Sequence, residues 1–164
     1  VYMRLGRLAA EDVNDPQNYH FDIGKGVVLR DGKDLTIIAT GLMVAKALAA
    51  AKQLEAQGIS ARVLNIHTIK PLDKELILQA AKETGLLITA EEHSIIGGLG
   101  EAVCAAVCET FPVPVVRIGV NDEFGSSGPA EKMLELYGLS TENIFRVAED
   151  MYKRKNNFHE RVGI

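Results

Sequence analysis

The clearest candidate site in the sequence is the stretch from Ala90 to Val103, which combines carboxylates, an imidazole and closely spaced glycines. Its chemically notable residues are Glu91, Glu92, His93, Gly97, Gly98 and Gly100. Successive glycine amides at the start of a helix can donate hydrogen bonds to a phosphate, so one interpretation is an anion site. Two features oppose it: the surrounding carboxylates, and Val103, which replaces the third glycine of the dinucleotide-binding pattern.

A structural interpretation of the same stretch competes with the anion site. The three glycines would permit a tight turn and a close approach of the following helix, because glycine has no Cβ atom. The residues from Glu91 to His93 would then be solvated or bonded to a neighbouring domain. We favour this second interpretation.

Two further polar clusters follow predicted strands. His67, Lys70 and Asp73 could form an acid–base cluster or, more simply, a capped turn with an exposed lysine. Residues 121–129 form a polar loop in which an exposed Phe124 would suit docking against another surface. Neither cluster places a nucleophile beside a base, so we assign no catalytic residue.

The cysteines and histidines give no sign of a metal site. Cys104 and Cys108 lie four residues apart in an apolar run, and we interpret them as reduced core residues without a chemical role. The four histidines are scattered and show no metal-ligand spacing with either cysteine.

The composition is that of one ordinary globular domain. Of the 164 residues, 47% are hydrophobic and 24% are charged, and the formal net charge is −4. A negative net charge gives no attraction to nucleic acids or anionic lipids, and no apolar run is long enough to span a membrane. We therefore expect neither a nucleic acid nor a membrane as partner, and the reduced cysteines are typical of a cytoplasmic protein.

From Asp34 onward, short β-branched apolar runs alternate with helical stretches, which is the order typical of an α/β domain. Strands are predicted at residues 35–39, 62–66, 86–90 and 113–120. Helices are predicted at residues 43–57 with Thr40 as cap, from Pro71 to a stop at Gly85, at 100–110, at 130–137, and from a Ser140 cap to a frayed end beyond Lys153. We predict a three-layer αβα fold with a mostly parallel sheet of about five strands.

The residues before Asp34 do not follow this alternation. Residues 1–5 are predicted to form a strand, residues 8–22 an irregular linker, and residues 24–30 an added antiparallel edge strand. A lone strand leaves backbone groups unsatisfied, so the first residues are expected to belong to a preceding domain. The chain begins with Val1 rather than Met, and we expect it to be cut from a longer polypeptide.

Several motifs together resemble the C-terminal part of transketolase. They are Val1-Tyr2-Met3-Arg4-Leu5-Gly6-Arg7, Lys70-Pro71-Leu72-Asp73, Glu91-Glu92-His93-Ser94-Ile95-Ile96-Gly97-Gly98-Leu99-Gly100, Phe124-Gly125-Ser126-Ser127-Gly128 and Tyr137-Gly138-Leu139. The resemblance covers nearly the whole chain and is closest to the separately encoded C-terminal section or subunit of split transketolases. Deoxyxylulose-phosphate synthase and the beta subunits of oxoacid dehydrogenases share the domain and are the alternatives.

The resemblance implies a domain organisation and an activity. Residues 1–22 would be the end of a pyrimidine-binding domain and a linker, residues 23–155 the transketolase C-terminal domain, and residues 156–164 a tail. The whole enzyme would use thiamine diphosphate and magnesium to transfer a two-carbon ketol unit between sugar phosphates. It would be a homodimer or a heterotetramer that includes a diphosphate-binding domain or subunit.

The resemblance also assigns roles to individual residues. Arg7 corresponds to a residue that binds the substrate phosphate. Glu91, Glu92, His93, Gly97, Gly98, Gly100 and Phe124 are expected at a domain or subunit contact.

The cofactor signature of the family is absent from this chain. There is no Gly-Asp-Gly followed downstream by an Asn pair, and the glutamate that activates the cofactor is missing as well. A fragment without either binding half cannot hold the cofactor, so we expect the isolated chain to bind none, to be inactive and to have a structural role in assembly. An independent anion-binding regulatory module is the remaining alternative.

Overall fold

The structure is a computed structural model that describes residues 1–6 and 9–162, with side chains described as far as residue 157. The strands are β1 (Val27–Arg30), β2 (Leu35–Ala39), β3 (Ala61–Asn65), β4 (Leu87–Ser94) and β5 (Val115–Val120). The helices are α1 (Met43–Ala56), α2 (Lys74–Thr84), α3 (Leu99–Cys108), α4 (Ala130–Leu136) and α5 (Thr141–Val162). None of the described helices is long and apolar enough to cross a membrane.

The strands form one five-stranded sheet in the order β1-β3-β2-β4-β5. Strands β2, β3, β4 and β5 are parallel to one another, and β1 pairs antiparallel with β3 at one edge. The predicted α/β class, the mostly parallel sheet and the antiparallel edge strand are therefore confirmed. Helices α1 and α3 follow the neighbouring strands β2 and β4 but lie on opposite faces of the sheet. The order of the strands therefore reverses between β2 and β4, which makes this a topological switch point.

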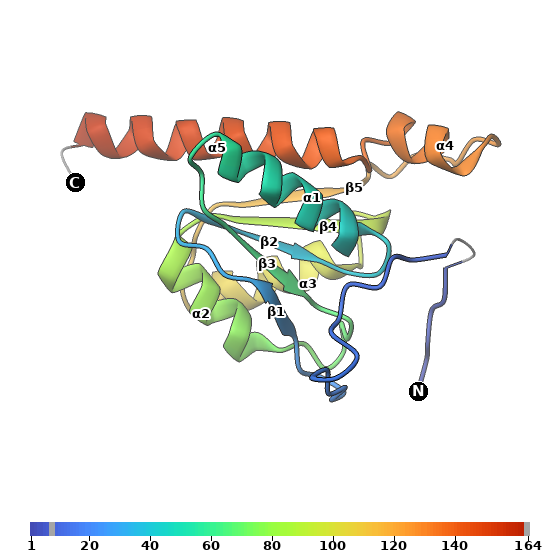
Figure 1. The fold of residues 1–164 in the computed structure, drawn as a ribbon. Coiled ribbons are helices and arrows are strands. Elements are labelled where there is room, and N and C mark those ends of the chain that lie inside the picture. The colour runs from blue at the N-terminus through green and yellow to red at the C-terminus, as the bar shows by residue number, and fades with distance from the viewer. Residues whose placement is uncertain (7–8, 163–164) are drawn as a thin grey trace.

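The helices cover both faces of the sheet, with α1 and α5 on one side and α2 on the other (Figure 1). Alternate residues of β2 explain this. Leu35, Ile37 and Ala39 pack in the core cluster that includes α1 and α5, whereas Ile38 packs in the cluster that includes α2 and α3. Because β2 is buried on both faces, its sequence is a continuous apolar run broken only by Thr36.

The beginnings of two helices differ from the prediction. Pro71 does not lie in the first turn of α2, because the helix begins at Lys74 and Asp73 caps it by accepting a hydrogen bond from the Leu76 amide at 3.2 Å. Thr40 does not cap α1 with its side chain; its backbone carbonyl accepts from the Met43 amide instead. The predicted stop of α2 at Gly85 is confirmed, since Gly85 has a φ of 63°.

The last helix continues well beyond the frayed end predicted near Lys153, because α5 reaches Val162. Lys155 helps to hold this part of α5 against the domain. Its Nζ donates to the backbone carbonyls of Thr84 at 2.6 Å and Asp34 at 3.0 Å, and burial lowers the pKa of the amine. The predicted cap at the start of the helix is confirmed, as Ser140 Oγ accepts from the Asn143 amide.

The residues before the sheet divide into two parts. Residues 1–6 form no strand, contrary to the prediction, and their side chains are exposed. From Val13 onward the segment packs on the domain: Val13 lies against the core, Phe21 stacks on His67 with ring centroids 4.6 Å apart, and the Gly26 amide donates to Asp73 at 2.9 Å. Figure 1 shows this segment passing beside the amino end of α1.

Candidate functional site

A bulge at the end of β4 determines how the Glu91–His93 stretch is presented. Ala90 pairs with Ile118 and Ser94 pairs with Val120, so Glu91, Glu92 and His93 together lie opposite Gly119. A Cβ atom on Gly119 would lie 2.8 Å from the His93 carbonyl oxygen. Glycine on β5 therefore allows the bulge, and a bulge of this kind redirects side chains next to a site.

Glu91 turns inward and fills the amino end of α3. Its side chain is 1% exposed, and its carboxylate accepts hydrogen bonds from the amides of Leu99 at 2.8 Å and Gly100 at 2.7 Å. A carboxylate is favourable there because the first amides of a helix have no partners within the helix and its dipole is positive at that end. The expectation that Glu91 is solvated or reserved for a neighbouring domain is therefore wrong.

The glycine turn makes room for this buried carboxylate. A Cβ atom on Gly98 would lie 2.0 Å from Glu91 Oε2, and this distance is too short for any side chain at position 98. Gly97 has a φ of 76°, and its amide donates to Glu101 Oε2 at 2.9 Å. Because carboxylates of this chain already bind the amides of Gly97, Leu99 and Gly100, the structure favours the structural interpretation over the anion site.

The residues that point outward are the ones available to a partner. Glu92 is half-buried, the side chain of His93 is 45% exposed, and Ile96 is exposed at the tip of the turn. His93 Nδ1 lies 2.8 Å from the Ser94 carbonyl oxygen, which fixes the ring at the surface. The contact role predicted for this stretch stays a prediction, and it now concerns Glu92 and His93 rather than Glu91.

The loop after β5 presents Phe124 to solvent from an anchored backbone. The Phe124 side chain is 100% exposed. The hydroxyl of Tyr137 accepts from the Ser126 amide at 2.8 Å and donates to the Phe124 carbonyl oxygen at 3.1 Å. Since β4 and β5 are adjacent and parallel, this loop and the β4–α3 turn leave the same edge of the sheet.

The other candidate residues are not assembled into a reactive site. Asp73 is used by the amides of Gly26 and Leu76, and Lys70 is exposed, so the capped turn describes this region better than an acid–base cluster. Cys108 is exposed rather than part of the core, and burial raises the pKa of the half-buried Cys104 thiol. Among the described residues, no three His, Cys, Asp or Glu side chains come together to hold a metal ion. Arg7 lies outside the described residues.

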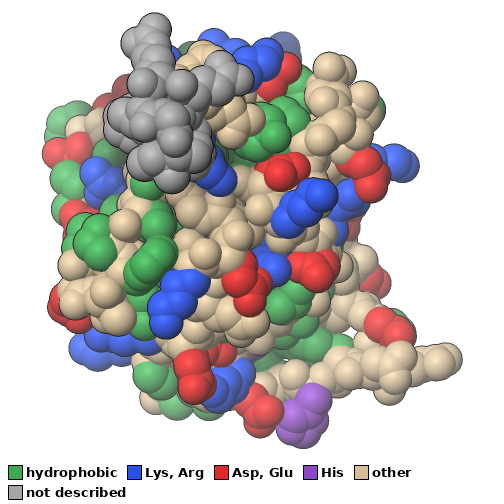
Figure 2. All heavy atoms as spheres, turned by 90° about the vertical axis from the view of Figure 1, so that its left-hand side faces the viewer, with side chains coloured by type: hydrophobic (Ala, Val, Ile, Leu, Met, Phe, Trp, Pro, Cys, Tyr) green, Lys and Arg blue, Asp and Glu red, His purple; other side chains and the backbone are tan. Residues whose placement is uncertain are grey.

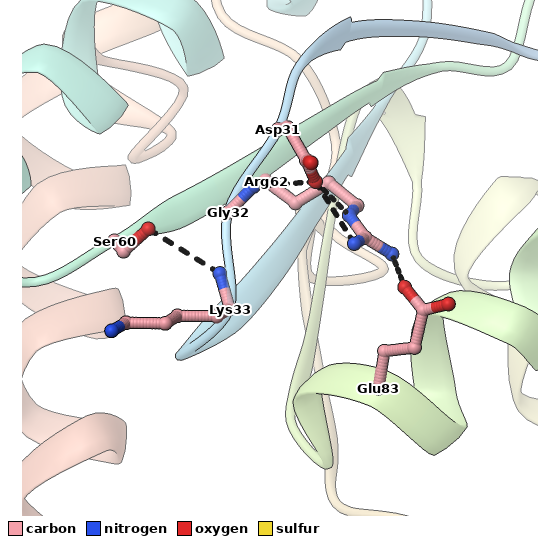
Figure 3. Close-up of a pocket in the computed structure, with 6 residues that line it drawn as sticks. All are labelled: Asp31, Gly32, Lys33, Ser60, Arg62 and Glu83. Atoms are coloured by element: carbon pink, nitrogen blue, oxygen red, sulfur yellow. Dashed lines mark hydrogen bonds and ion pairs between the residues drawn. The ribbon is translucent and has the colours of Figure 1, made fainter.

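An ion-pair network that no sequence pattern predicted lies at the opposite, amino edge of the sheet (Figure 3). Arg62 at the start of β3 bridges Asp31, with Nη2 at 2.9 Å, and Glu83 of α2. The Gly32 amide, and after it Arg62, hold the pKa of Asp31 below its usual value. These residues line a cavity of about 480 Å³ with Lys33 and Ser60.

This amino-edge network is a structural feature that links three elements rather than a ligand site. The guanidinium of Arg62 is already bound by the two carboxylates, and its side chain is only 12% exposed. Figure 2 looks at this side of the molecule and shows positive and negative side chains interspersed, without a patch of one sign. Its residues are far apart in the sequence and become neighbours only in the folded chain.

A second cavity was also not predicted, and it lies at the carboxyl edge. It has a volume of about 530 Å³ and is enclosed by residues 10–19, the start of α1 and the end of β3, including Asn65 and His67. His67 Nδ1 lies 2.9 Å from Thr68 Oγ1, and burial lowers the pKa of the imidazole. The signal in the sequence was His67 itself, assigned above to a different cluster.

Comparison with known proteins supports a family assignment. The family described as "Transketolase, C-terminal domain" matches residues 24–144. A 6-deoxy-6-sulfo-D-fructose transketolase subunit from Clostridium sp. (strain MSTE9) is 48% identical over 156 residues, covering 95% of this chain and 48% of the relative. A 1-deoxy-D-xylulose-5-phosphate synthase from Heliobacterium modesticaldum is 46% identical over 130 residues, covering 79% of this chain and 20% of that enzyme.

A solved structure described as "Split gene transketolase, inactive beta4 tetramer" has the same fold. Its TM-score is 0.88 at 49% sequence identity, and the match covers 93% of this chain and 50% of that chain. The chain thus spans about half the length of the transketolase subunit and of the split-gene transketolase that it matches.

Proposed function

The chain belongs to the transketolase C-terminal domain family, and we propose that it is the C-terminal part of a thiamine-diphosphate-dependent transketolase. In this proposal the complete enzyme transfers a two-carbon ketol unit between sugar phosphates. The observation that carries it is the match of 95% of the chain to about half of a transketolase subunit at 48% identity. The synthase relative matches a smaller part of the chain, so its activity is the second candidate.

The described residues do not fit the diphosphate of the cofactor. The glycine turn is the candidate phosphate site, and its amides are already bonded to Glu91 and Glu101. Thiamine diphosphate and magnesium therefore belong to other parts of the complete enzyme in this proposal. The chain contributes to assembly, with a pyrimidine-binding domain before it and a diphosphate-binding domain or subunit beside it.

The assembly role is supported by the exposed residues at the carboxyl edge. Phe124 is fully exposed on a loop that Tyr137 holds in place, and His93 is exposed on the neighbouring turn. An apolar side chain on an ordered backbone loses little entropy on binding, which suits a domain or subunit contact. The split-transketolase neighbour is described as a tetramer, and we propose a multi-subunit enzyme here as well.

Joint expression tests the proposed activity. The complete subunit that contains this chain is purified with its diphosphate-binding subunit or domain, and transfer of a two-carbon unit between sugar phosphates is followed by mass spectrometry. We expect transfer that requires thiamine diphosphate and magnesium, and no transfer by the 164-residue chain alone. Formation of 1-deoxy-D-xylulose 5-phosphate instead would favour the synthase, and activity of the isolated chain would contradict the assembly role.

Two substitutions in the complete enzyme test the assigned residues. Arg7→Ala should raise KM for phosphorylated substrates, whereas Lys33→Ala, at the amino edge, should leave it unchanged.

Phe124→Ser should weaken subunit assembly, as measured by sedimentation. Phe111→Ser is the matched control, because Phe111 is also exposed, at 40%, but follows α3 at the other edge of the sheet. Equal effects of the paired changes would contradict these roles.

A further inference from the structure

The two cysteines of the chain form a pair on one helix, and the proposed function leaves this pair unused. Cys104 and Cys108 lie four residues apart on α3, and Cys108 is the last residue of the helix. Residues at this spacing occupy the same side of a helix, with their Cβ atoms about 5 to 6 Å apart. The sequence contains no third cysteine, so the thiol chemistry of this chain is confined to the pair.

Both thiols are free, and neither belongs to the buried core. Cys108 is exposed and Cys104 is half-buried, because α3 turns its other side, with Val103 and Val107, into the core. The pair lies at the carboxyl end of α3, whereas the glycine turn lies at its amino end. A ligand can therefore approach the pair from solvent without disturbing the core or the glycine turn.

The spacing of the pair is too wide for a disulfide and matches a single bridging ion. A disulfide needs Cβ atoms about 3.5 to 4.5 Å apart, which is less than a helix gives at this spacing. Two sulfur atoms on opposite sides of one metal ion lie about 4.6 Å apart when each metal–sulfur bond is about 2.3 Å long. The two thiols are therefore better placed to bind one ion than to bond to each other.

The number of ligands and the charge nearby narrow the choice of ion. A structural zinc site takes four ligands, and among the described residues no three His, Cys, Asp or Glu side chains could hold a metal ion. Thiolates select soft ions such as Cu(I), for which two sulfur ligands in line are sufficient. Burial raises the pKa of the Cys104 thiol, and the guanidinium of Arg117, which also lies 3.9 Å from Glu101, opposes that shift. The pair thus has one nearby cation to balance the single negative charge of Cu(I) held by two thiolates.

We propose that Cys104 and Cys108 form a two-coordinate site for the soft monovalent cation Cu(I). Binding is a ligand exchange without oxidation or reduction: two S–H bonds break, two S–Cu bonds form, and two protons pass to water. The bound ion joins adjacent turns of α3. The site depends neither on the proposed transketolase activity nor on the contact residues at the carboxyl edge of the sheet.

Anaerobic titration of the 164-residue chain with Cu(I) tests the site, with the coloured chelator bicinchoninate as competitor. We expect one ion per chain, and X-ray absorption of the complex should show two sulfur ligands. Cys108→Ser, at the exposed position, should weaken binding by about 100-fold or more, because a second thiolate on the same chain acts at a high effective concentration. Cys104→Ser should have an effect of similar size.

A variant that keeps two thiols at the wrong spacing is the matched control. Ala105→Cys combined with Cys108→Ser places the thiols at neighbouring positions, which do not face each other on a helix, and Ala105 is exposed. This control should bind Cu(I) as weakly as Cys108→Ser alone. The proposal is overturned by one ion shared between two chains, or by binding to Cys108→Ser or to the control that is as tight as binding to the native chain. Circular dichroism of each variant establishes that it is folded before affinities are compared.

Discussion

Two strand-to-helix turns lie at the carboxyl edge of the sheet, where β2 passes into α1 and β4 passes into α3. In the β4–α3 turn, the buried carboxylate of Glu91 occupies the first amides of the helix. In the β2–α1 turn no described side chain caps the helix, and a cavity of about 530 Å³ lies beside it. One turn is completed by the chain itself, and the other leaves space.

The difference shows that a glycine-rich turn is not by itself a ligand site. The β4–α3 turn contains the glycines that suggested anion binding, yet they serve to admit a side chain of the protein. The β2–α1 turn has a single glycine, Gly41, and remains open. Because the amides of the closed turn are satisfied within the chain, the contact proposed for this stretch would involve the outward residues Glu92 and His93.

The largest expected effect is that of Gly98→Ala, which would break the closed turn. The new Cβ atom would lie 2.0 Å from Glu91 Oε2, so the carboxylate must leave the amides of Leu99 and Gly100. Loss of two hydrogen bonds to a buried charge should lower the free energy of unfolding by about 3 kcal/mol or more. Urea denaturation of the 164-residue chain measures this change.

A double substitution shows whether the clash with Glu91 is the cause. In a chain that already carries Glu91→Ala, the space next to Gly98 is empty, and Gly98→Ala should cost much less than it does in the native chain. If the two losses simply add, the carboxylate is not what Gly98 accommodates, and the explanation of the closed turn is wrong.

The next effect is that of Glu91→Gln, which keeps the shape of the side chain and removes its charge. The amide oxygen of glutamine can still accept one bond, but its NH₂ group would face the other helix amide. We expect a loss of about 2 kcal/mol in the free energy of unfolding. Glu92→Gln, at the half-buried neighbour, should stay within about 0.5 kcal/mol of the native chain. Similar losses for both variants would contradict the inward role of Glu91.

The fold could be predicted because the apolar runs of the strands and the glycine and proline signals are local. Strand β2 and helix α1 were predicted almost to the residue, and Gly85 ends α2 as expected. The orientation of Glu91 could not be predicted, because it depends on a bulge opposite Gly119 on another strand. Two adjacent glutamates in a sequence do not reveal which of them turns inward.

In the candidate site as well, features set by local sequence could be predicted, and features set by contacts between distant residues could not. Phe124 was expected to be exposed, and it is, because its loop consists of polar and small residues. The Arg62 network and the cavity beside His67 depend on segments about 20 or more positions apart in the chain, which no local pattern marks. The packing of residues 13–26 on the domain was likewise invisible, because single contacts by Val13 and Phe21 carry it rather than a periodic face.

A smaller effect is expected for Gly41→Ala, the matching change in the open turn. Gly41 has a φ of 56°, but no atom lies within 4 Å of the place that a Cβ would take. The cost is therefore backbone strain alone, about 1 kcal/mol of unfolding free energy. Gly41→Asn should cost less, because asparagine tolerates this conformation better than alanine. A loss as large as that of Gly98→Ala would mean that the two turns are equally crowded.

The smallest effect concerns pH and again separates the open turn from the closed one. Burial lowers the pKa of His67 from its ordinary value of 6.5, so below pH 6.5 the unfolded chain binds more protons than the folded chain. The stability that depends on neutral His67 is thus complete above pH 6.5 and is lost as the pH falls below that value. Thermal unfolding of the native chain and of His67→Gln over this range should show a steeper decline for the native chain. Parallel declines would mean that burial beside the open turn does not favour the neutral form of His67.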